Sequence, residues 1–182
     1  GLGDVYKRQD HTPCILMSAY GNRDFDDTLA QMKDILEARG FYCIGAIAPI
    51  IPHIYSEKLG ADRPNAEDEK VFRRFAVTVK QRLENGLEES LMIPGNPNPE
   101  PKTMKPVVHY FDETKCKGCQ TCVQKCPTSA INKDTYQIKE ELCVGCLRCE
   151  KVCPGGARSS DYEAVKKYLE DNFCLPKEIK CY

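Results

Sequence analysis

The sequence carries no excess of charge of either sign. Lys and Arg number 26 and Asp and Glu number 27 among 182 residues, so the formal net charge is −1. This balance argues against a nucleic-acid partner held by bulk charge. Long hydrophobic runs are also absent, because Pro49 and Pro52 interrupt the longest apolar stretch, from Cys43 to Ile54. A membrane span needs roughly 20 apolar residues, so we expect none here.

Groups for nucleophilic catalysis are scarce as well. The three histidines, His11, His53 and His109, are scattered, and no Ser, Cys or Asp stands at a spacing that suggests a catalytic partner. The sequence also has no Gly-rich or Ser/Thr-rich loop suited to cradling a phosphate. We therefore expect no catalytic residue in this chain.

Cysteine, in contrast, is abundant: there are 12, and eight of them form an internal repeat. The pattern C-x2-C-x2-C-x3-C-P occurs twice, with equivalent cysteines 27 residues apart and with Pro127 or Pro154 at its end. This is the ligand run of bacterial iron–sulfur proteins. Gly118 and Gly145 inside the runs let backbone amides approach the cluster sulfurs.

The proline after each fourth cysteine favours an extended backbone, so that cysteine is expected to reach across to the other cluster. The sequence therefore predicts two [4Fe–4S] clusters with crossed ligation. The first set is Cys116, Cys119, Cys122 and Cys153, and the second is Cys143, Cys146, Cys149 and Cys126.

Two other readings of the cysteines are weaker. Zinc sites favour paired C-x2-C knuckles, and a triple run is poor geometry for one tetrahedral ion. A disulfide framework needs an oxidising compartment, and disulfides between neighbouring C-x2-C cysteines would cross-link the fold poorly. Cys14 and Cys43 lie in apolar segments and are expected in a core.

Residues 107–160 resemble a dicluster bacterial-type ferredoxin domain. Val107 to Phe111 would be its entering strand. Ser129, Ala130 and Ile131 follow the first proline, and Tyr136 to Ile138 would be the returning strand of a small hairpin. Arg158 departs from the family, which usually places an apolar residue there. It could loosen the apolar cover of one cluster or raise its potential; a solvated Arg at the domain edge is the favoured interpretation.

The N-terminal part reads strand, helix, strand, helix, which is typical of a parallel α/β sheet. The predicted strands cover residues 13–19 and 41–48, and both look apolar on two faces. Asp24 is expected to cap the first helix, with Asp26 and Asp27 in its first turn. Asn65 is expected to cap the second helix, and its apolar face is predicted as Phe72, Phe75, Val79 and Leu83.

The stretch from Tyr20 to Asp27, YGNRDFDD, is similar to the late part of flavodoxin-like domains that are fused to a C-terminal dicluster ferredoxin. The resemblance implies that Tyr20, Gly21 and Asn22 border a flavin, FMN, in the full-length parent. It also implies that residues 11–93 are the C-terminal part of a larger flavodoxin-like domain. The fold class predicted is thus α/β plus α+β: a partial parallel β/α segment followed by a small ferredoxin domain.

The remaining segments are expected to be connections and ends. Residues 1–10 are interpreted as a non-native or disordered leader, and residues 94–106, with five prolines, as a semi-rigid linker. Residues 161–182 are predicted as a final helix and tail, with Tyr162, Val165 and Leu169 on one helix face.

The function expected from these features is single-electron transfer to or from a flavin or a redox partner protein, in a reducing cytoplasm. This chain is interpreted as a carrier rather than a stand-alone enzyme. The alternatives are the C-terminal part of an FMN-dependent oxidoreductase and, less favoured, a zinc-structured interaction module.

Overall fold

The structure, a computed structural model, describes residues 11–86, 89–100 and 107–182. The chain divides into two compact units, which we call unit 1 (Gly1–Pro101 with Leu169–Tyr182) and unit 2 (Lys102–Tyr168). The expected leader at 1–10 and part of the expected linker, 101–106, lie outside the described residues. No helix in the described part of the chain is both long enough and apolar enough to cross a membrane.

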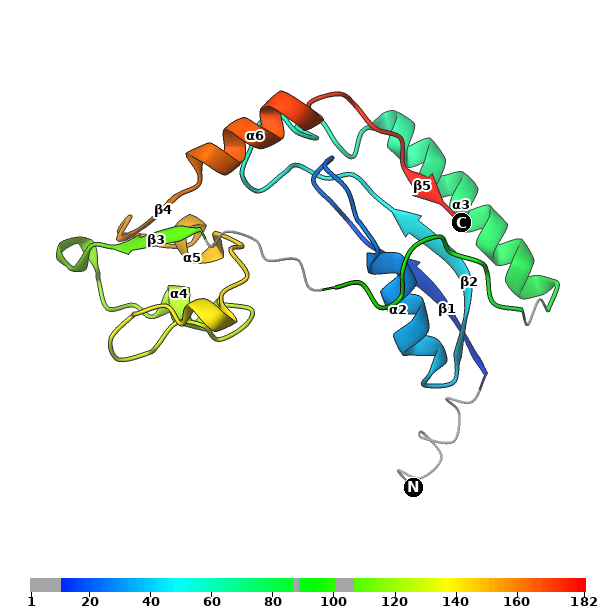
Figure 1. The fold of residues 1–182 in the computed structure, drawn as a ribbon, viewed down its shortest axis with the longest axis horizontal. Helices are drawn as coiled ribbons and strands as arrows, with labels where there is room; N and C mark the ends of the chain where they lie inside the picture. The colour runs from blue at the N-terminus through cyan, green and yellow to red at the C-terminus, as the bar shows by residue number, and fades with distance from the viewer. Residues whose placement is uncertain (1–10, 87–88, 101–106) are drawn as a thin grey trace, which may run out of the picture. The chain divides into compact units, whose positions relative to one another are not determined.

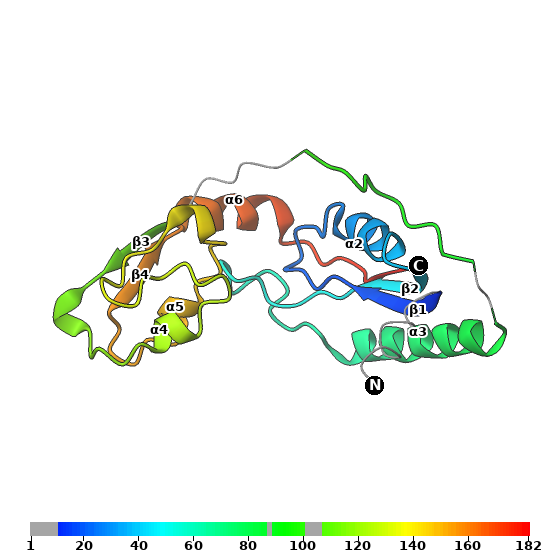
Figure 2. The same ribbon diagram turned by 90° about the horizontal axis from the view of Figure 1, so that it is seen from below.

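Unit 1 is a small mixed α/β arrangement whose elements follow the predicted order. These are β1 (Thr12–Met17), α2 (Thr28–Glu37), β2 (Phe41–Ala48) and α3 (Ala66–Glu84). β1 and β2 pair in parallel, and β5 (Lys180–Cys181) adds to the other edge of β2 in the antiparallel sense. α2 and α3 lie on opposite sides of this sheet (Figure 2). The flavodoxin-like resemblance itself stays a prediction.

The core of unit 1 lies between the sheet and α2. Leu16, Leu29 and Cys43 are fully buried there, and Phe25, Met32 and Leu36 pack against them. Cys14 is partly buried against the same cluster, as expected of a core cysteine. On the other face, Gly45 of β2 leaves room for α3: a Cβ there would stand 2.6 Å from a methyl carbon of Val79.

Three expectations about unit 1 are wrong in detail. α2 begins at Thr28 after Asp27, not after Asp24, and Asp27 makes no side-chain cap bond because its Oδ1 accepts from the amide of Asn96 instead. β1 is not covered on both faces: Ile15 and Met17 are 51% and 60% exposed on this edge strand, and α3 packs on the neighbouring β2. Leu83 is also exposed, in the last turn of α3, where the neighbouring Arg82 is the side chain that reaches the sheet and donates to the carbonyl of Ile44.

The start of α3 is built as the sequence predicts. Asn65 accepts hydrogen bonds from the amides of Glu67 and Asp68, and Asp68 accepts in return from the amide of Asn65. This reciprocal capping box satisfies amides that have no partner inside the helix. Asp68 is 3% exposed and also forms a two-pronged ion pair with Arg63.

Unit 2 shows the internal repeat as structure. Each half has a 3-10 turn, η2 (Glu113–Lys115) or η3 (Glu140–Leu142), and then a one-turn helix, α4 (Thr121–Gln124) or α5 (Arg148–Lys151). Gln120 and Leu147, 27 residues apart, precede these helices in the same left-handed conformation, with φ of 56° and 52°. Both halves therefore follow the same backbone path.

The sheet of unit 2 contains one strand that the sequence does not predict. β3 (Val108–Phe111) is the expected entering strand, and β4 (Arg158–Asp161) lies antiparallel beside it (Figure 1). The expected small hairpin is present in reduced form, with an antiparallel bridge between Ile131 and Ile138. Backbone hydrogen bonds from Asn132 to Gln137 and from Lys139 to Ala130 flank that bridge. α6 (Glu163–Phe173) follows β4 and matches the predicted final helix; its last residues, from the buried Leu169 on, belong to unit 1.

Candidate metal centre

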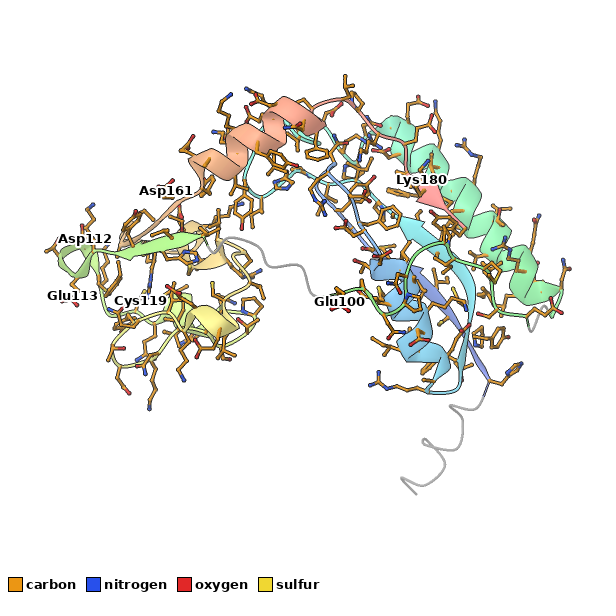
Figure 3. All side chains as sticks on the ribbon, viewed as in Figure 1. Glu100, Asp112, Glu113, Cys119, Asp161 and Lys180 are labelled. Carbon is orange, nitrogen blue, oxygen red and sulfur yellow. The ribbon has the colours of Figure 1, made fainter. Side chains whose placement is uncertain are left out.

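A small pocket in unit 2 is lined by four of the repeat cysteines. They are Cys116, Cys119, Cys122 and Cys153. Three belong to the first run and the fourth to the second, so the pocket draws on both halves of the repeat. Cys122 on α4 is 9% exposed, whereas Cys119, labelled in Figure 3, lies at the surface just before that helix. We call this pocket A.

The other four repeat cysteines line a second pocket of the same kind. They are Cys126, Cys143, Cys146 and Cys149. Here the second run supplies three and the first run supplies one; we call this pocket B. The structure thus brings together the same two sets of four cysteines that the sequence predicts for crossed ligation.

Hydrogen bonds from the backbone reach the sulfurs at equivalent places in the two halves. The amide of Ala130 donates to Cys126 Sγ and that of Ala157 to Cys153 Sγ, both at 3.2 Å. The amide of Gly118, whose φ is 64°, donates to Cys116 Sγ at 3.5 Å. Donors aimed at sulfur stabilise thiolate charge. This lining suits sulfur ligands that must be deprotonated.

The pKa values of three cysteines reflect this environment. A hydrogen bond from the Thr121 hydroxyl, at 3.3 Å, lowers the pKa of Cys119. Burial would raise the pKa of Cys126, but the amides of Thr128 and Ala130 outweigh it and hold the pKa below its ordinary value. Burial raises the pKa of Cys149, and the Arg158 guanidinium opposes that rise.

His109, which the sequence leaves without a role, lies at pocket B. Its Nε2 is 3.3 Å from Cys143 Sγ, and its Nδ1 is 2.8 Å from the hydroxyl of Ser160 on the neighbouring strand. Burial and then Arg158 lower the pKa of this imidazole, while Glu150 and Glu140 act in the opposite direction. The internal repeat is the sequence signal that relates His109 to the cysteines. His109 precedes Cys116 by the same interval that separates Tyr136 from Cys143, so the two residues hold equivalent positions in the two halves.

Arg158 is not the solvated edge residue that the sequence favours. It is 5% exposed at the start of β4 and lines pocket A. Its guanidinium carbon stands 4.5 Å from the centre of the Phe111 ring, and Nη2 donates to the carbonyl of Tyr136. The aromatic face and the carbonyl hold the charge inside the unit, and Tyr136 and Phe111 reach it from distant parts of the sequence.

The residues present fit an iron–sulfur group better than a single ion. Among the described residues, no three His, Cys, Asp or Glu side chains lie close enough together to hold one metal ion. Four thiolates that each bind a different iron of a cubane stand farther apart than four on one zinc, whose bonds to sulfur are about 2.3 Å. The Nε of Arg158 is buried with no hydrogen-bond partner in the described chain, as a cation beside an anionic group would be. The donor set and this unmatched charge both suit a negatively charged cluster.

The three residues predicted to border a flavin lie together where β1 ends, but their groups already make contacts. Tyr20 is 8% exposed and packs edge-on against Phe25. Asn22 is 2% exposed, and its side-chain amide donates to the carbonyls of Phe173 and Leu175. Gly21 stands so close to His53 that a Cβ would lie 2.5 Å from the ring. A flavin at this place stays a prediction.

Comparison with known proteins bears on unit 2. Residues 115–157 match the family model of the 4Fe-4S dicluster domain. No curated protein matches the chain. The match covers all eight repeat cysteines, and it supports a ferredoxin-type domain that binds [4Fe–4S] clusters in this part of the chain, with iron–sulfur electron transfer as its function.

Proposed function

We propose that unit 2 holds two [4Fe–4S] clusters, one in pocket A and one in pocket B, and that the chain passes single electrons between them and a redox partner. The observation that carries the proposal is the division of the eight repeat cysteines between two pockets, three from one run and one from the other in each. The clusters would supply the electron-accepting chemistry. The protein would supply the thiolates, the amides that donate to sulfur and the cover that limits water.

The proposal names the residues that bind each cluster. Cys116, Cys119, Cys122 and Cys153 would hold the cluster of pocket A, and Cys126, Cys143, Cys146 and Cys149 that of pocket B. Two positions are exposed to a partner: Cys119 in pocket A and, beside pocket B, Val144, which is 64% exposed. A redox protein or a flavin domain could approach a cluster at either place.

Counting iron in paired variants tests both the number of clusters and the crossing. Anaerobically reconstituted protein should contain about eight iron and eight acid-labile sulfide per chain. Cys119→Ser with Cys153→Ser removes two ligands of one cluster, so about four iron should remain. Cys119→Ser with Cys126→Ser removes one ligand from each cluster, so both should be lost.

The two double variants are matched, since each replaces Cys119 and one fourth cysteine of a run. Uncrossed ligation gives the reverse result, with iron retained by the Cys119→Ser, Cys126→Ser protein. Reconstituted protein that binds zinc and contains no acid-labile sulfide would contradict the proposal altogether.

A further inference from the structure

The two pockets have the same cysteine framework but different linings, and the internal repeat makes the comparison direct. Arg158 of pocket A corresponds to Ile131 of pocket B, since both follow the fourth cysteine of their run by the same interval. By the same offset of 27 residues, Phe111 of pocket A corresponds to Ile138 of pocket B. Pocket A therefore has a cation where pocket B has an aliphatic side chain.

The charge of Arg158 is directed at the sulfur ligands. Its Nη2 lies 4.0 Å from Cys122 Sγ. Among the residues that the structure describes, no carboxylate forms an ion pair with Arg158, and its Nε has no hydrogen-bond partner. Because the side chain is 5% exposed, water screens this charge only weakly. The field of the guanidinium therefore acts on whatever occupies pocket A, where its Nη2 reaches a sulfur, and it also extends to Cys149 of pocket B.

We propose that Arg158 makes the two clusters unequal: it raises the reduction potential of the cluster in pocket A above that of the cluster in pocket B, so the first electron rests in pocket A. The inference depends on the two clusters of the proposed function. A cluster becomes more negative by one charge when it is reduced, and a buried cation stabilises the more negative state.

Hydrogen bonds to sulfur do not cancel this difference. His109 contacts Cys143 Sγ in pocket B, but pocket A has its own side-chain donor, Thr121, on Cys119. The backbone donors on Cys126 and Cys153 are equivalent at 3.2 Å. A buried full charge acts more strongly than one added hydrogen bond. Pocket B is also lined by an arginine, Arg148, but that side chain is exposed, so water screens its charge. Arg158 is the buried cation of the two, and its Nη2 lies 4.0 Å from a sulfur of pocket A.

Redox titration of the reconstituted holoprotein, followed by electron paramagnetic resonance, tests the proposal. The wild-type protein should show two separate one-electron steps. Arg158→Gln keeps a polar side chain that can still donate to the Tyr136 carbonyl but removes the charge. It should lower the reduction equilibrium constant of the upper step about ten-fold, equivalent to about 59 mV for one electron. The lower of the two reduction potentials should shift less, so the difference between the two potentials should decrease.

Arg158→Lys is the matched control, because it retains the charge and should retain most of that difference. Each variant is also measured with only one cluster present. Cys126→Ser with Cys143→Ser leaves only the cluster of pocket A, and removal of the charge should lower the reduction potential of that cluster by the full amount. Cys119→Ser with Cys153→Ser leaves pocket B loaded, and there the shift should be smaller. Arg158→Ile, which installs the residue of the other half of the repeat, replaces the Gln variant if that variant does not bind iron.

Three results would overturn the inference. The first is an unchanged difference between the two reduction potentials in both charge-removing variants. The second is an equal shift in the Lys and Gln variants, because packing rather than charge would then be responsible. The third is loss of all cluster in every variant at position 158, which would replace the redox role with a structural one. Failure of the proposed function looks different: the wild-type protein itself would then lack two clusters by iron and sulfide content before any titration.

Discussion

Asp68 is the most constrained acidic residue of unit 1. Burial would raise its pKa, but hydrogen bonds from Arg63 and from the amide of Asn65 outweigh burial and hold the pKa below its ordinary value. The Arg63 side chain is itself 11% exposed and also donates to the carbonyl of Lys177. The pair therefore ties the start of α3 to the C-terminal segment, and each partner is costly to leave without the other.

Asp68→Asn should lower the free energy of unfolding of unit 1 by about 3 kcal/mol at neutral pH, since Arg63 would remain buried without its counter-charge. A carboxyl whose pKa is lowered by folding stabilises fully above its unfolded pKa, and that stability is lost as the pH falls through the folded pKa. The difference in free energy of unfolding between the wild-type protein and Asp68→Asn should thus decrease below about pH 4. Denaturant unfolding of both proteins between pH 7 and acid checks this; a constant difference at all pH values would contradict it.

Gly155 illustrates how closely the backbone packs around pocket A. A Cβ at this position would stand 2.4 Å from the carbonyl oxygen of Lys115, the residue before Cys116. Gly156, next in the chain, has a φ of 62° and open space around it. Of these two glycines, Gly155 is therefore the one that lets the second run of cysteines approach the first.

Gly155→Ala should displace the backbone beside Cys116 and speed the loss of iron to a chelator several-fold, because overpacking of this kind costs about 1–3 kcal/mol. Gly156→Ala is the control: it strains the backbone of one residue, but its Cβ contacts no other residue. This variant should lose iron more slowly than Gly155→Ala. Release is followed by absorbance under anaerobic conditions. Equal rates of iron loss for the two variants would contradict this prediction, because the backbone at Lys115 would then move aside at no cost in free energy.

The helix α3 depends on its first turn more than on its last. Asn65 caps it with two accepted hydrogen bonds, whereas Asn85 at the other end terminates it through backbone bonds. Asn65→Ala should cost about 1 kcal/mol of stability. Asn85→Ala should cost much less. Thermal unfolding of unit 1 by circular dichroism compares the two, and similar losses at both ends would contradict this account of the cap.

Elements with a clear local signal could be predicted from the sequence, and elements made by distant pairing could not. The spacing of Phe25, Leu29 and Met32 indicates α2 because the apolar positions recur at helical intervals. β4 reads Arg-Ser-Ser-Asp, and no apolar alternation marks it; it exists because β3 pairs with it across the unit. β5, two residues long, is likewise fixed only by its pairing with β2.

The candidate site likewise has a part that could be predicted from the sequence and a part that could not. The cysteine sets follow from the spacing of the runs, since spacing decides which sulfurs a tight loop can gather. The burial of Arg158 does not follow, because an arginine is mostly exposed unless a specific partner holds it. Here the partners are the Phe111 ring and the Tyr136 carbonyl, which the fold alone brings to it.

Taken whole, the chain combines a unit with an aliphatic core and a unit in which few aliphatic side chains are buried. Unit 1 buries Leu16, Leu29 and Ile47 almost completely. Among the residues of unit 2 that the structure describes, the buried ones are Cys122, Ala130, Ile131, Leu147, Ala157 and Arg158. So few aliphatic groups cannot balance the loss of chain entropy by themselves. Cluster binding is then part of the folding free energy of unit 2.

Removal of iron by a chelator under mild denaturing conditions should therefore unfold unit 2 and spare unit 1. Hydrogen exchange resolves the two: the amides of Ala130 and Ala157, which donate to sulfur, should lose protection, while the amides of β2 keep theirs. Reconstitution should restore the lost protection. Equal loss in both units, or none in either, would contradict a cluster-dependent fold confined to unit 2.

The exposed face of β1 has a consequence for the molecule in concentrated solution. Ile15 and Met17 stand on a strand that, in the described chain, ends its sheet. Such an edge is a template on which any extended chain can add another strand, including one from a second copy of the molecule. Met17→Lys would place a gatekeeping charge on that edge, and a preparation carrying it should stay monodisperse at concentrations where the unmodified protein begins to aggregate.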